Sequence, residues 1–242
     1  MTKFAGQLAV VTGASSGIGK AIALELARQG ATLCLVGRSR EALRAVAEST
    51  GEASPKIRCY RADFTVDEDV HELVAQLRRD CSAIDVLIHS AGIIVNGALA
   101  ALPVEDLDRQ YRTNVRAPYL LTQALLSLLK ACQGQIVFMN STVGLNAGAN
   151  TGQYAATKHA LRAVADSLRA EVNPQGVRVL SVYLGRTATP MQEAVHQMEG
   201  RAYRPDLLMQ PEDVATVVLN ALSVPRTAEV TDIHLRPMIK SY

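Results

Sequence analysis

Tyr154 and Lys158 place a phenol and an ammonium group at helical spacing. They frame the segment Tyr154-Ala155-Ala156-Thr157-Lys158, and residues i and i+4 are neighbours on one face of a helix. A nearby cation favours the phenolate and lowers the pKa of a tyrosine from about 10 toward neutral pH. Such a tyrosine can exchange protons with a reacting group, as general acid–base catalysis requires. The pair alone is a weak signal, because many such pairs are ordinary surface residues.

Two further polar residues precede this pair. Ser141 lies thirteen residues before Tyr154, at the end of the predicted strand 136–139, and Asn114 lies within the predicted helix 105–131. The four residues carry more weight as a set than any one of them does. We therefore take Asn114, Ser141, Tyr154 and Lys158 as the candidate catalytic residues.

A glycine-rich turn follows the first predicted strand and opens an amphipathic helix. It reads Thr12-Gly13-Ala14-Ser15-Ser16-Gly17-Ile18-Gly19. Glycines at this place let the backbone turn tightly and approach a pyrophosphate, whose charge meets the free N–H groups of the helix. The spacing Gly-x-x-x-Gly-x-Gly indicates a dinucleotide site, and a plain strand-to-helix turn is the alternative.

The same turn also matches Gly-x-Ser-x-Gly, the nucleophile elbow of serine hydrolases, with Ser15 at its centre. An elbow needs an oxyanion donor from an earlier loop between a strand and a helix. Only fourteen residues precede Ser15, so the supporting elements have no place in the chain. A serine hydrolase is therefore the less favoured interpretation.

The end of the second predicted strand indicates which dinucleotide binds. An acidic residue about 20 residues past the glycines would bind a ribose 2′-hydroxyl, whereas an arginine would accept a 2′-phosphate. The strand ends in Val36-Gly37-Arg38-Ser39-Arg40, with no acid. Arg38 offers a planar, permanently charged set of donors, with Ser39 or Arg40 beside it. NADP(H) is therefore favoured over NAD(H), and a solvated loop arginine is the alternative.

Short apolar runs alternate with helix-length segments along the chain. The runs predict strands at 8–11, 33–36, 57–60, 86–88, 136–139 and 177–182, and the intervening segments predict helices at 17–29, 39–49, 66–79, 105–131 and 153–172. Gly30 and Gly51 suit helix C-caps, Thr65 with Glu68 suits a capping box, and Pro211 suits a helix start. This alternation is typical of a parallel α/β sheet. The least regular long stretch is 184–210, which predicts a binding or lid segment.

These motifs together resemble the compact, single-domain short-chain dehydrogenases/reductases, a Rossmann-fold family. The matching positions are the turn 12–19, Asp63, Ala91, Gly92, Asn114, Ser141, Tyr154, Lys158 and Thr189. The resemblance implies that Tyr154 is the general acid/base, that Ser141 holds the substrate oxygen, and that Asn114 supports a water-linked proton relay. It also implies that Lys158 binds the nicotinamide ribose and lowers the pKa of Tyr154.

The resemblance further implies contacts with the cofactor. Asp63 would touch the adenine and Thr189 the nicotinamide carboxamide. The full expected set is Thr12, Gly13, Ser15, Ser16, Gly17, Ile18, Gly19, Arg38, Ser39, Asp63, Phe64, Ser90, Ala91, Gly92, Tyr154, Lys158, Gly185, Thr187 and Thr189. Two positions depart from the family: His89-Ser90 replaces Asn-Asn, which alters the bonds that brace the sheet, and Leu184 replaces a proline, which predicts a more mobile segment after Gly185.

The composition of the chain excludes several classes of protein and disfavours a polyanionic partner. The chain has 242 residues, 25 Lys plus Arg, 23 Asp plus Glu, a net charge of +2 and 48% hydrophobic residues. Disorder, collagen and coiled coil are excluded. So small a net charge does not favour a polyanion, so we expect a small-molecule partner and no nucleic acid.

Other signals bear on compartment, metals and assembly. Four widely spaced cysteines and the lack of an N-terminal apolar segment predict a reduced, cytoplasmic protein, and no apolar run reaches the ~20 residues that span a membrane. His71-Glu72 lacks the second histidine of a zinc motif, and the other histidines show no ligand spacing, so no metal is expected. The apolar surplus on 105–131 and on the helix after it predicts a homodimer or homotetramer, as the family resemblance suggests.

We therefore expect an α/β protein with a Rossmann-type doubly wound parallel sheet, helices on both faces, and a single domain over 1–242. Its expected activity is hydride transfer between NADP(H) and a carbonyl or alcohol, as a carbonyl reductase or alcohol dehydrogenase. A non-catalytic NADP(H)-binding regulatory module is the alternative, and the complete four-residue set argues against it. Residues 93–98, 142–150 and 184–204 are expected to line the substrate pocket, with Val95, Leu145, Met191 and Met198 making it partly apolar.

Overall fold

Seven parallel strands form one sheet in the computed structural model, which describes residues 2–239. Their order is β3-β2-β1-β4-β5-β6-β7, so the chain runs outward from β1 on one side and from β4 on the other. The strands are β1 Leu8–Thr12, β2 Thr32–Gly37, β3 Ile57–Arg61, β4 Val86–His89, β5 Gln135–Ser141, β6 Arg178–Leu184 and β7 Asp232–Leu235. The order reverses between β1 and β4, which is where open α/β sheets bind ligands at the carboxyl ends of their strands.

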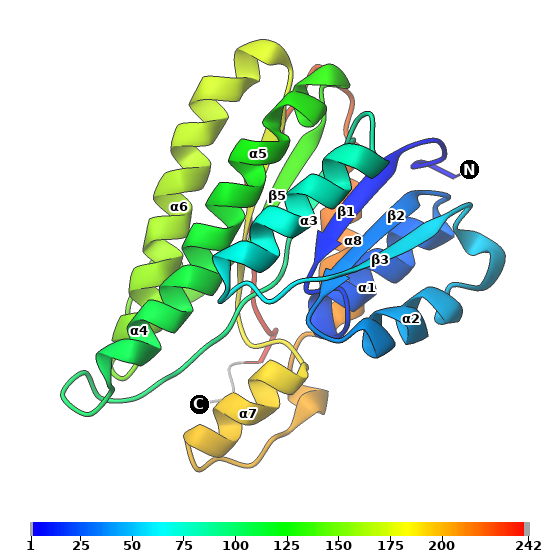
Figure 1. Ribbon diagram of the computed structural model, residues 1–242. Helices are drawn as coiled ribbons and strands as arrows, with labels where there is room; N and C mark the ends of the chain where they lie inside the picture. The colour runs from blue at the N-terminus through cyan, green and yellow to red at the C-terminus, as the bar shows by residue number, and fades with distance from the viewer. Residues whose placement is uncertain (1, 240–242) are drawn as a thin grey trace.

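Helices cover both faces of the sheet (Figure 1). On one face, α1 Gly17–Arg28, α2 Arg40–Ser49 and α8 Pro211–Leu222 bury apolar residues such as Ile22, Leu43 and Val218 against the strands. On the other face, α3 Asp67–Asp80, α5 Ala117–Ala131 and α6 Gly152–Val172 bury residues such as Leu73 and Leu125. The central strands are covered on both sides and are mostly apolar, as is typical of a parallel sheet. The doubly wound fold expected from the sequence is confirmed.

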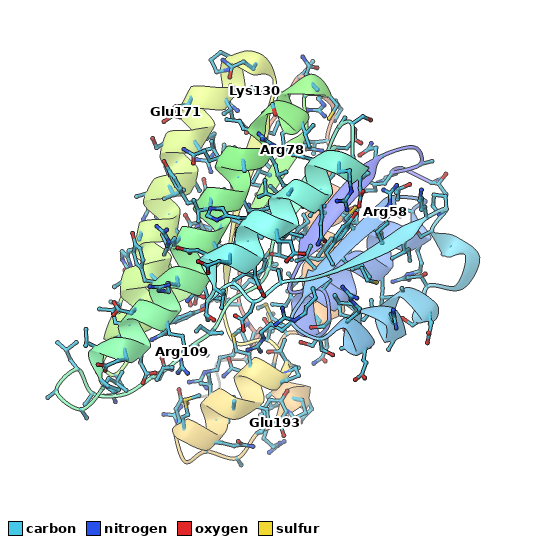
Figure 2. The ribbon with its side chains drawn as sticks, in the orientation of Figure 1. Arg58, Arg78, Arg109, Lys130, Glu171 and Glu193 are labelled. Carbon is cyan, nitrogen blue, oxygen red and sulfur yellow. The ribbon has the colours of Figure 1, made fainter. Side chains whose placement is uncertain are left out.

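Charged side chains lie on the outer surfaces of these helical layers. Arg109 on α4 (Val104–Tyr111), Lys130 on α5 and Glu171 on α6 are exposed, and in Figure 2 Lys130 and Glu171 lie near one end of the layer and Arg109 near the other. No helix among residues 2–239 is both long and apolar enough to cross a membrane. The expected domain 1–242 also contains residues 1 and 240–242, which lie outside the described residues.

The predicted helix 105–131 is interrupted. It forms α4, then a π-helical turn over Arg112–Arg116, and then α5. Asn114 lies in this turn, and its side-chain amide is bonded to the backbone of Ile93: Oδ1 accepts from the Ile93 amide at 2.9 Å, and Nδ2 donates to its carbonyl at 2.9 Å. Because these bonds are made to a loop far away in the sequence, helical periodicity alone could not reveal the turn.

Three other local predictions need correction. The sequence missed β7, whose Asp232–Leu235 segment alternates exposed and partly buried residues at the edge of the sheet. It also missed α7, Pro190–Met198, within the stretch that was expected to be irregular. The capping box of Thr65 and Glu68 is wrong: α3 begins at Asp67, and the Thr65 hydroxyl donates instead to Asp63 Oδ1 at 2.7 Å.

Candidate active site

One cavity of about 380 Å³ lies at the carboxyl ends of the strands, between the glycine turn and α7. Its walls come from six consecutive strand ends and from α6 and α7. The predicted residues that line it are Gly13, Ser15, Ser16, Gly17, Ile18, Gly19, Arg38, Asp63, Phe64, Ser90, Ala91, Gly92, Ser141, Tyr154, Lys158, Gly185, Thr187 and Thr189. Segments far apart in the sequence therefore form one continuous site.

The glycine turn is shaped for close approach of a ligand to the backbone. Gly13 has φ +67°, and a Cβ there would lie 2.8 Å from the backbone nitrogen of Ala91, so only glycine fits. The first turn of α1 contains no acidic residue, and its N-cap residue, Ser16, makes no side-chain capping bond. The positive end of this helix thus keeps free N–H donors beside the cavity, and the turn fits a pyrophosphate.

The end of β2 places a cation at the far side of the same cavity. Arg38 is exposed, lines the cavity, and makes no ion pair with any residue that the structure describes. Burial raises the pKa of Asp63, but hydrogen bonds from the amide and hydroxyl of Thr65, with the charge of Arg38, hold the pKa below its ordinary value. Asp63 is therefore an anion at neutral pH beside an uncommitted guanidinium.

Ser141, Tyr154 and Lys158 meet where β5 ends beside α6. Ser141 is the last residue of β5, and its hydroxyl both accepts from the Val143 amide at 3.3 Å and lies 3.5 Å from the Leu184 carbonyl. Lys158 Nζ donates to the Met139 carbonyl at 2.9 Å and lies 5.6 Å from the centre of the Tyr154 ring. The sequence prediction that these three side chains share a site is supported by their common place in the cavity wall.

The protonation of this group differs from the expectation. Burial raises the pKa of Tyr154 to about 12, and a hydrogen bond with Ser141 only partly opposes the rise. Burial also lowers the pKa of Lys158 to about 8. The expected lowering of the tyrosine pKa by the lysine is therefore absent in this structure. Near neutral pH Tyr154 is a neutral phenol that can give up a proton, and most Lys158 is still a cation.

Asn114 does not line the cavity, although it was expected to join the catalytic set. Its side chain is buried and fully used: besides the two bonds to Ile93, Nδ2 donates to the Thr157 hydroxyl at 3.1 Å. Thr157 in turn donates to the Tyr154 carbonyl at 2.8 Å. Asn114 thus ties the loop after β4 to the helix that carries Tyr154, and in this structure its side chain positions the site.

Two expected cofactor residues also do not reach the cavity wall. The Thr12 hydroxyl donates to the Ile88 carbonyl and accepts from the amides of Ser90 and Ala91, which fixes the loop after β4 against β1. The Ser39 hydroxyl caps α2 by accepting from the Ala42 amide at 3.2 Å. Thr12 is therefore buried behind the site, whereas Ser39 is exposed at the start of α2 and outside the cavity wall.

The cavity wall also contains residues that the sequence had not singled out by name. Asn96, Arg186, Gln192, Val195 and Glu199 fall within the expected ranges 93–98 and 184–204, Thr113 lies outside them, and Val95, Leu145 and Met198 do not line the wall. Five buried side-chain atoms in the described part of the chain have no hydrogen-bond partner, and three of them are Asn96 Oδ1, Thr113 Oγ1 and Arg186 Nη1. Unpaired buried polar atoms are costly, so their concentration around one cavity indicates a polar ligand. Because this signal is tertiary, no spacing in the sequence could have revealed it.

The two departures from the family pattern have structural counterparts. His89 is buried, its ring stacks on Phe138 at 4.9 Å, and its Nε2 lies 2.8 Å from the Thr122 hydroxyl. It therefore links β4 to β5 and α5 through contacts different from those of an asparagine. Gly185 follows Leu184, and its amide donates to the Leu235 carbonyl at 2.8 Å, so β7 holds the start of the segment where the proline is missing.

The fold and the site together define an oxidoreductase of the Rossmann type. The family model for short chain dehydrogenases matches residues 7–200. An uncharacterized oxidoreductase of Staphylococcus epidermidis is 32% identical over 239 residues, which cover 98% of this chain and 100% of that protein. The chain belongs to the short-chain dehydrogenase family and is an oxidoreductase.

Solved structures agree with this assignment. The alcohol dehydrogenase of the archaeon Thermococcus sibiricus, complexed with 5-hydroxy-NADP, has a TM-score of 0.88 and 27% identity over 98% of both chains. A metagenomic short-chain oxidoreductase in complex with NADP has a TM-score of 0.84 and 28% identity, covering 98% of this chain and 100% of that one.

Proposed function

We propose that the protein is an NADP(H)-dependent carbonyl reductase or alcohol dehydrogenase in which Tyr154 exchanges a proton with the substrate oxygen. The observation that carries the proposal is the shared cavity: Ser141, Tyr154 and Lys158 line the same space as the glycine turn and Arg38. A dinucleotide laid from Arg38 across the turn would bring its reactive end toward Tyr154.

The protein's part of the chemistry follows from the pKa values and contacts. The nicotinamide, when bound, supplies or accepts the hydride. In reduction, Tyr154 donates its proton to the carbonyl oxygen as negative charge develops there, and the Ser141 hydroxyl donates a second hydrogen bond to the same oxygen. Lys158 adds positive charge beside the phenol and, by resemblance to the family, holds the nicotinamide ribose. In alcohol oxidation Tyr154 must accept the proton instead, and its raised pKa keeps it at neutral pH in the protonated form that reduction uses.

Tyr154→Phe tests this role directly. The substitution keeps the ring and removes the hydroxyl, so we expect turnover to fall by at least about 10³-fold with NADPH binding nearly unchanged. NADPH oxidation with a panel of aldehydes and ketones measures the first, and fluorescence titration measures the second. Tyr111→Phe, at a half-exposed tyrosine of α4, is the matched control. Undiminished turnover in Tyr154→Phe would overturn the assignment.

The cofactor preference rests on Arg38. Its guanidinium is unpaired within the described chain, sits at the end of β2, and suits a 2′-phosphate, while no acid stands there to bind a 2′-hydroxyl. The NADP complexes of the two related structures support the same choice. Residues 184–210 are proposed to close over the substrate, because Met191, Gln192 and Val195 of α7 reach the cavity.

Arg38→Asp is expected to weaken NADPH binding by about 10²-fold or more and to leave NADH binding within about threefold, because a bidentate charged contact becomes a like-charge repulsion. Dissociation constants for both cofactors give the result. Arg44→Asp makes the same change of charge on α2, at an exposed residue outside the cavity wall, and serves as the control. A larger loss for NADH than for NADPH would contradict the role of Arg38.

A further inference from the structure

Arg186 stands at the substrate end of the cavity. It lies two residues beyond Leu184, whose carbonyl is 3.5 Å from the Ser141 hydroxyl, and its side chain lines the cavity with Ser141 and Tyr154. Arg186 therefore lies on the segment that leaves β6 beside Ser141, in the wall of the same cavity.

Only one arm of the Arg186 guanidinium has a partner. Nη2 donates to both carboxylate oxygens of Glu199, at 2.9 and 2.8 Å, and these two side chains are 29% and 25% exposed. Nη1 is buried and has no acceptor in the part of the chain that the structure describes. Burying an N–H of a charged group without an acceptor is unfavourable, and a ligand oxygen at this point would relieve the cost.

The charge around Glu199 is also unbalanced. Arg201 Nε lies 3.7 Å from Glu199 Oε2, so two guanidinium groups share one carboxylate. The cluster of Arg186, Glu199 and Arg201 thus has one excess positive charge, which a monoanionic group on a ligand would neutralise. Ile94, Val143 and Met191 lie in the same wall, which gives the carbon chain of such a ligand apolar surface to contact.

We propose that the substrate is a carbonyl compound that also carries a carboxylate, and that Arg186 binds this carboxylate through Nη1. The inference rests on the proposed function and names its substrate class. Glu199 holds the guanidinium plane in place through Nη2, and the free edge selects an oxo acid over an uncharged ketone or ester. In the reverse direction the substrate is the corresponding hydroxy acid.

Arg186→Gln tests the inference with pairs of substrates that differ only in charge. Aliphatic oxo acids and their methyl esters, matched in chain length, are assayed with NADPH. In the wild-type protein we expect kcat/KM to be at least about tenfold higher for the acid than for its methyl ester. In Arg186→Gln we expect a loss of about 10²-fold for the acid, carried mainly by KM, and a change within about threefold for the ester.

Two further variants locate the effect. Arg201→Gln removes the second cation, which is half-exposed and lies outside the cavity wall. Because solvent screens this charge, the acid-to-ester ratio is expected to fall by less than about threefold. Glu199→Gln removes the competing carboxylate and is expected to raise the preference for the acid. NADPH binding by Arg186→Gln, measured directly, reports whether the variant still folds and whether a cofactor phosphate is the partner of Nη1.

The outcomes are distinct. Equal losses for acid and ester in Arg186→Gln would make the arginine a structural clamp on α7 and overturn the inference, as would a loss of NADPH affinity of tenfold or more. Turnover of esters and ketones without a preference for acids would overturn the inference alone. Absence of turnover with every carbonyl compound would overturn the proposed function and, with it, the substrate class.

Discussion

The buried charge of Lys158 lowers the stability of the folded protein, although the proposed reaction uses that charge. Its side chain is buried, its ammonium finds the Met139 carbonyl, and burial lowers its pKa to about 8 from an ordinary value of 10.5. Below pH 8 both the folded and the unfolded protein carry this charge, so the full cost of burying it opposes folding. The unfolded state binds more protons between pH 8 and 10.5, and the free energy of unfolding therefore rises with pH across that window.

Lys158→Met should consequently stabilise the protein while it removes activity. We expect the free energy of unfolding at pH 7 to increase by about 1–3 kcal/mol, because the buried charge is replaced by an apolar chain of similar length. Urea titrations at pH 7 and pH 10.5 measure the effect, which should shrink at the higher pH. A decrease in stability at pH 7 would show that the hydrogen bond to Met139 outweighs the cost of burial.

Prediction of catalytic side chains from the sequence succeeded where their chemistry follows from residue type and spacing. Tyr154 and Lys158 share the cavity wall with Ser141, as their positions indicated. It failed where the property depends on surroundings: the direction of the Tyr154 pKa shift is set by burial, and the place of Asn114 is set by hydrogen bonds to Ile93. Arg186 fell within the range 184–204 that was expected to line the pocket, but its unpaired nitrogen exists only in the folded chain.

The side chain of His89 connects β4 with β5 and α5. It ends β4, stacks on Phe138 of β5, and bonds Thr122 of α5, and burial lowers its pKa to about 3 from 6.5. Between these pH values the unfolded state takes up a proton that the folded state does not. The free energy of unfolding therefore falls as the pH falls from 6.5 toward 3.

His89→Asn should flatten this dependence, because asparagine does not titrate in the window. The histidine accounts for a loss on the order of 4 kcal/mol between pH 6.5 and 3. Chemical denaturation at a series of pH values compares the slopes of the two proteins, and His159→Asn, at an exposed histidine of α6, is the control. Equal slopes in the variant and the unchanged protein would place the acid sensitivity elsewhere.

Helices and strands were predictable from the sequence wherever their local residue pattern matches their burial in the fold. Five of the six predicted strands carry apolar runs because they are buried within the sheet, and Gly30 and Gly51 have positive φ at the ends of α1 and α2 as their capping positions require. The missed elements have weaker patterns. β7 lies at the sheet edge and is partly exposed, and the π-helical turn depends on a distant loop rather than on its own periodicity.

The layer formed by α4 and α5 has large hydrophobic side chains that are exposed to solvent. Tyr111 is 48% exposed, Tyr119 is 49% exposed, and Val104 is 60% exposed. These residues lie on α4 and α5, which together form the predicted helix 105–131. Its apolar surplus, with that of the helix after it, predicted a subunit interface. Neighbouring exposed groups of this kind favour self-association through a symmetric face.

We therefore expect the chain to assemble as a homodimer or homotetramer through this face. Sedimentation equilibrium should give a mass two or four times that of the 26.0 kDa chain. Tyr119→Glu, which puts a charge in the middle of the face, should shift the equilibrium toward monomer by at least about tenfold in the dissociation constant. Lys130→Glu alters the charge on the same helix at its far end and should have a smaller effect. A chain that sediments as a monomer at all concentrations would contradict the predicted interface, whereas loss of assembly in both variants alike would extend it to the far end of α5.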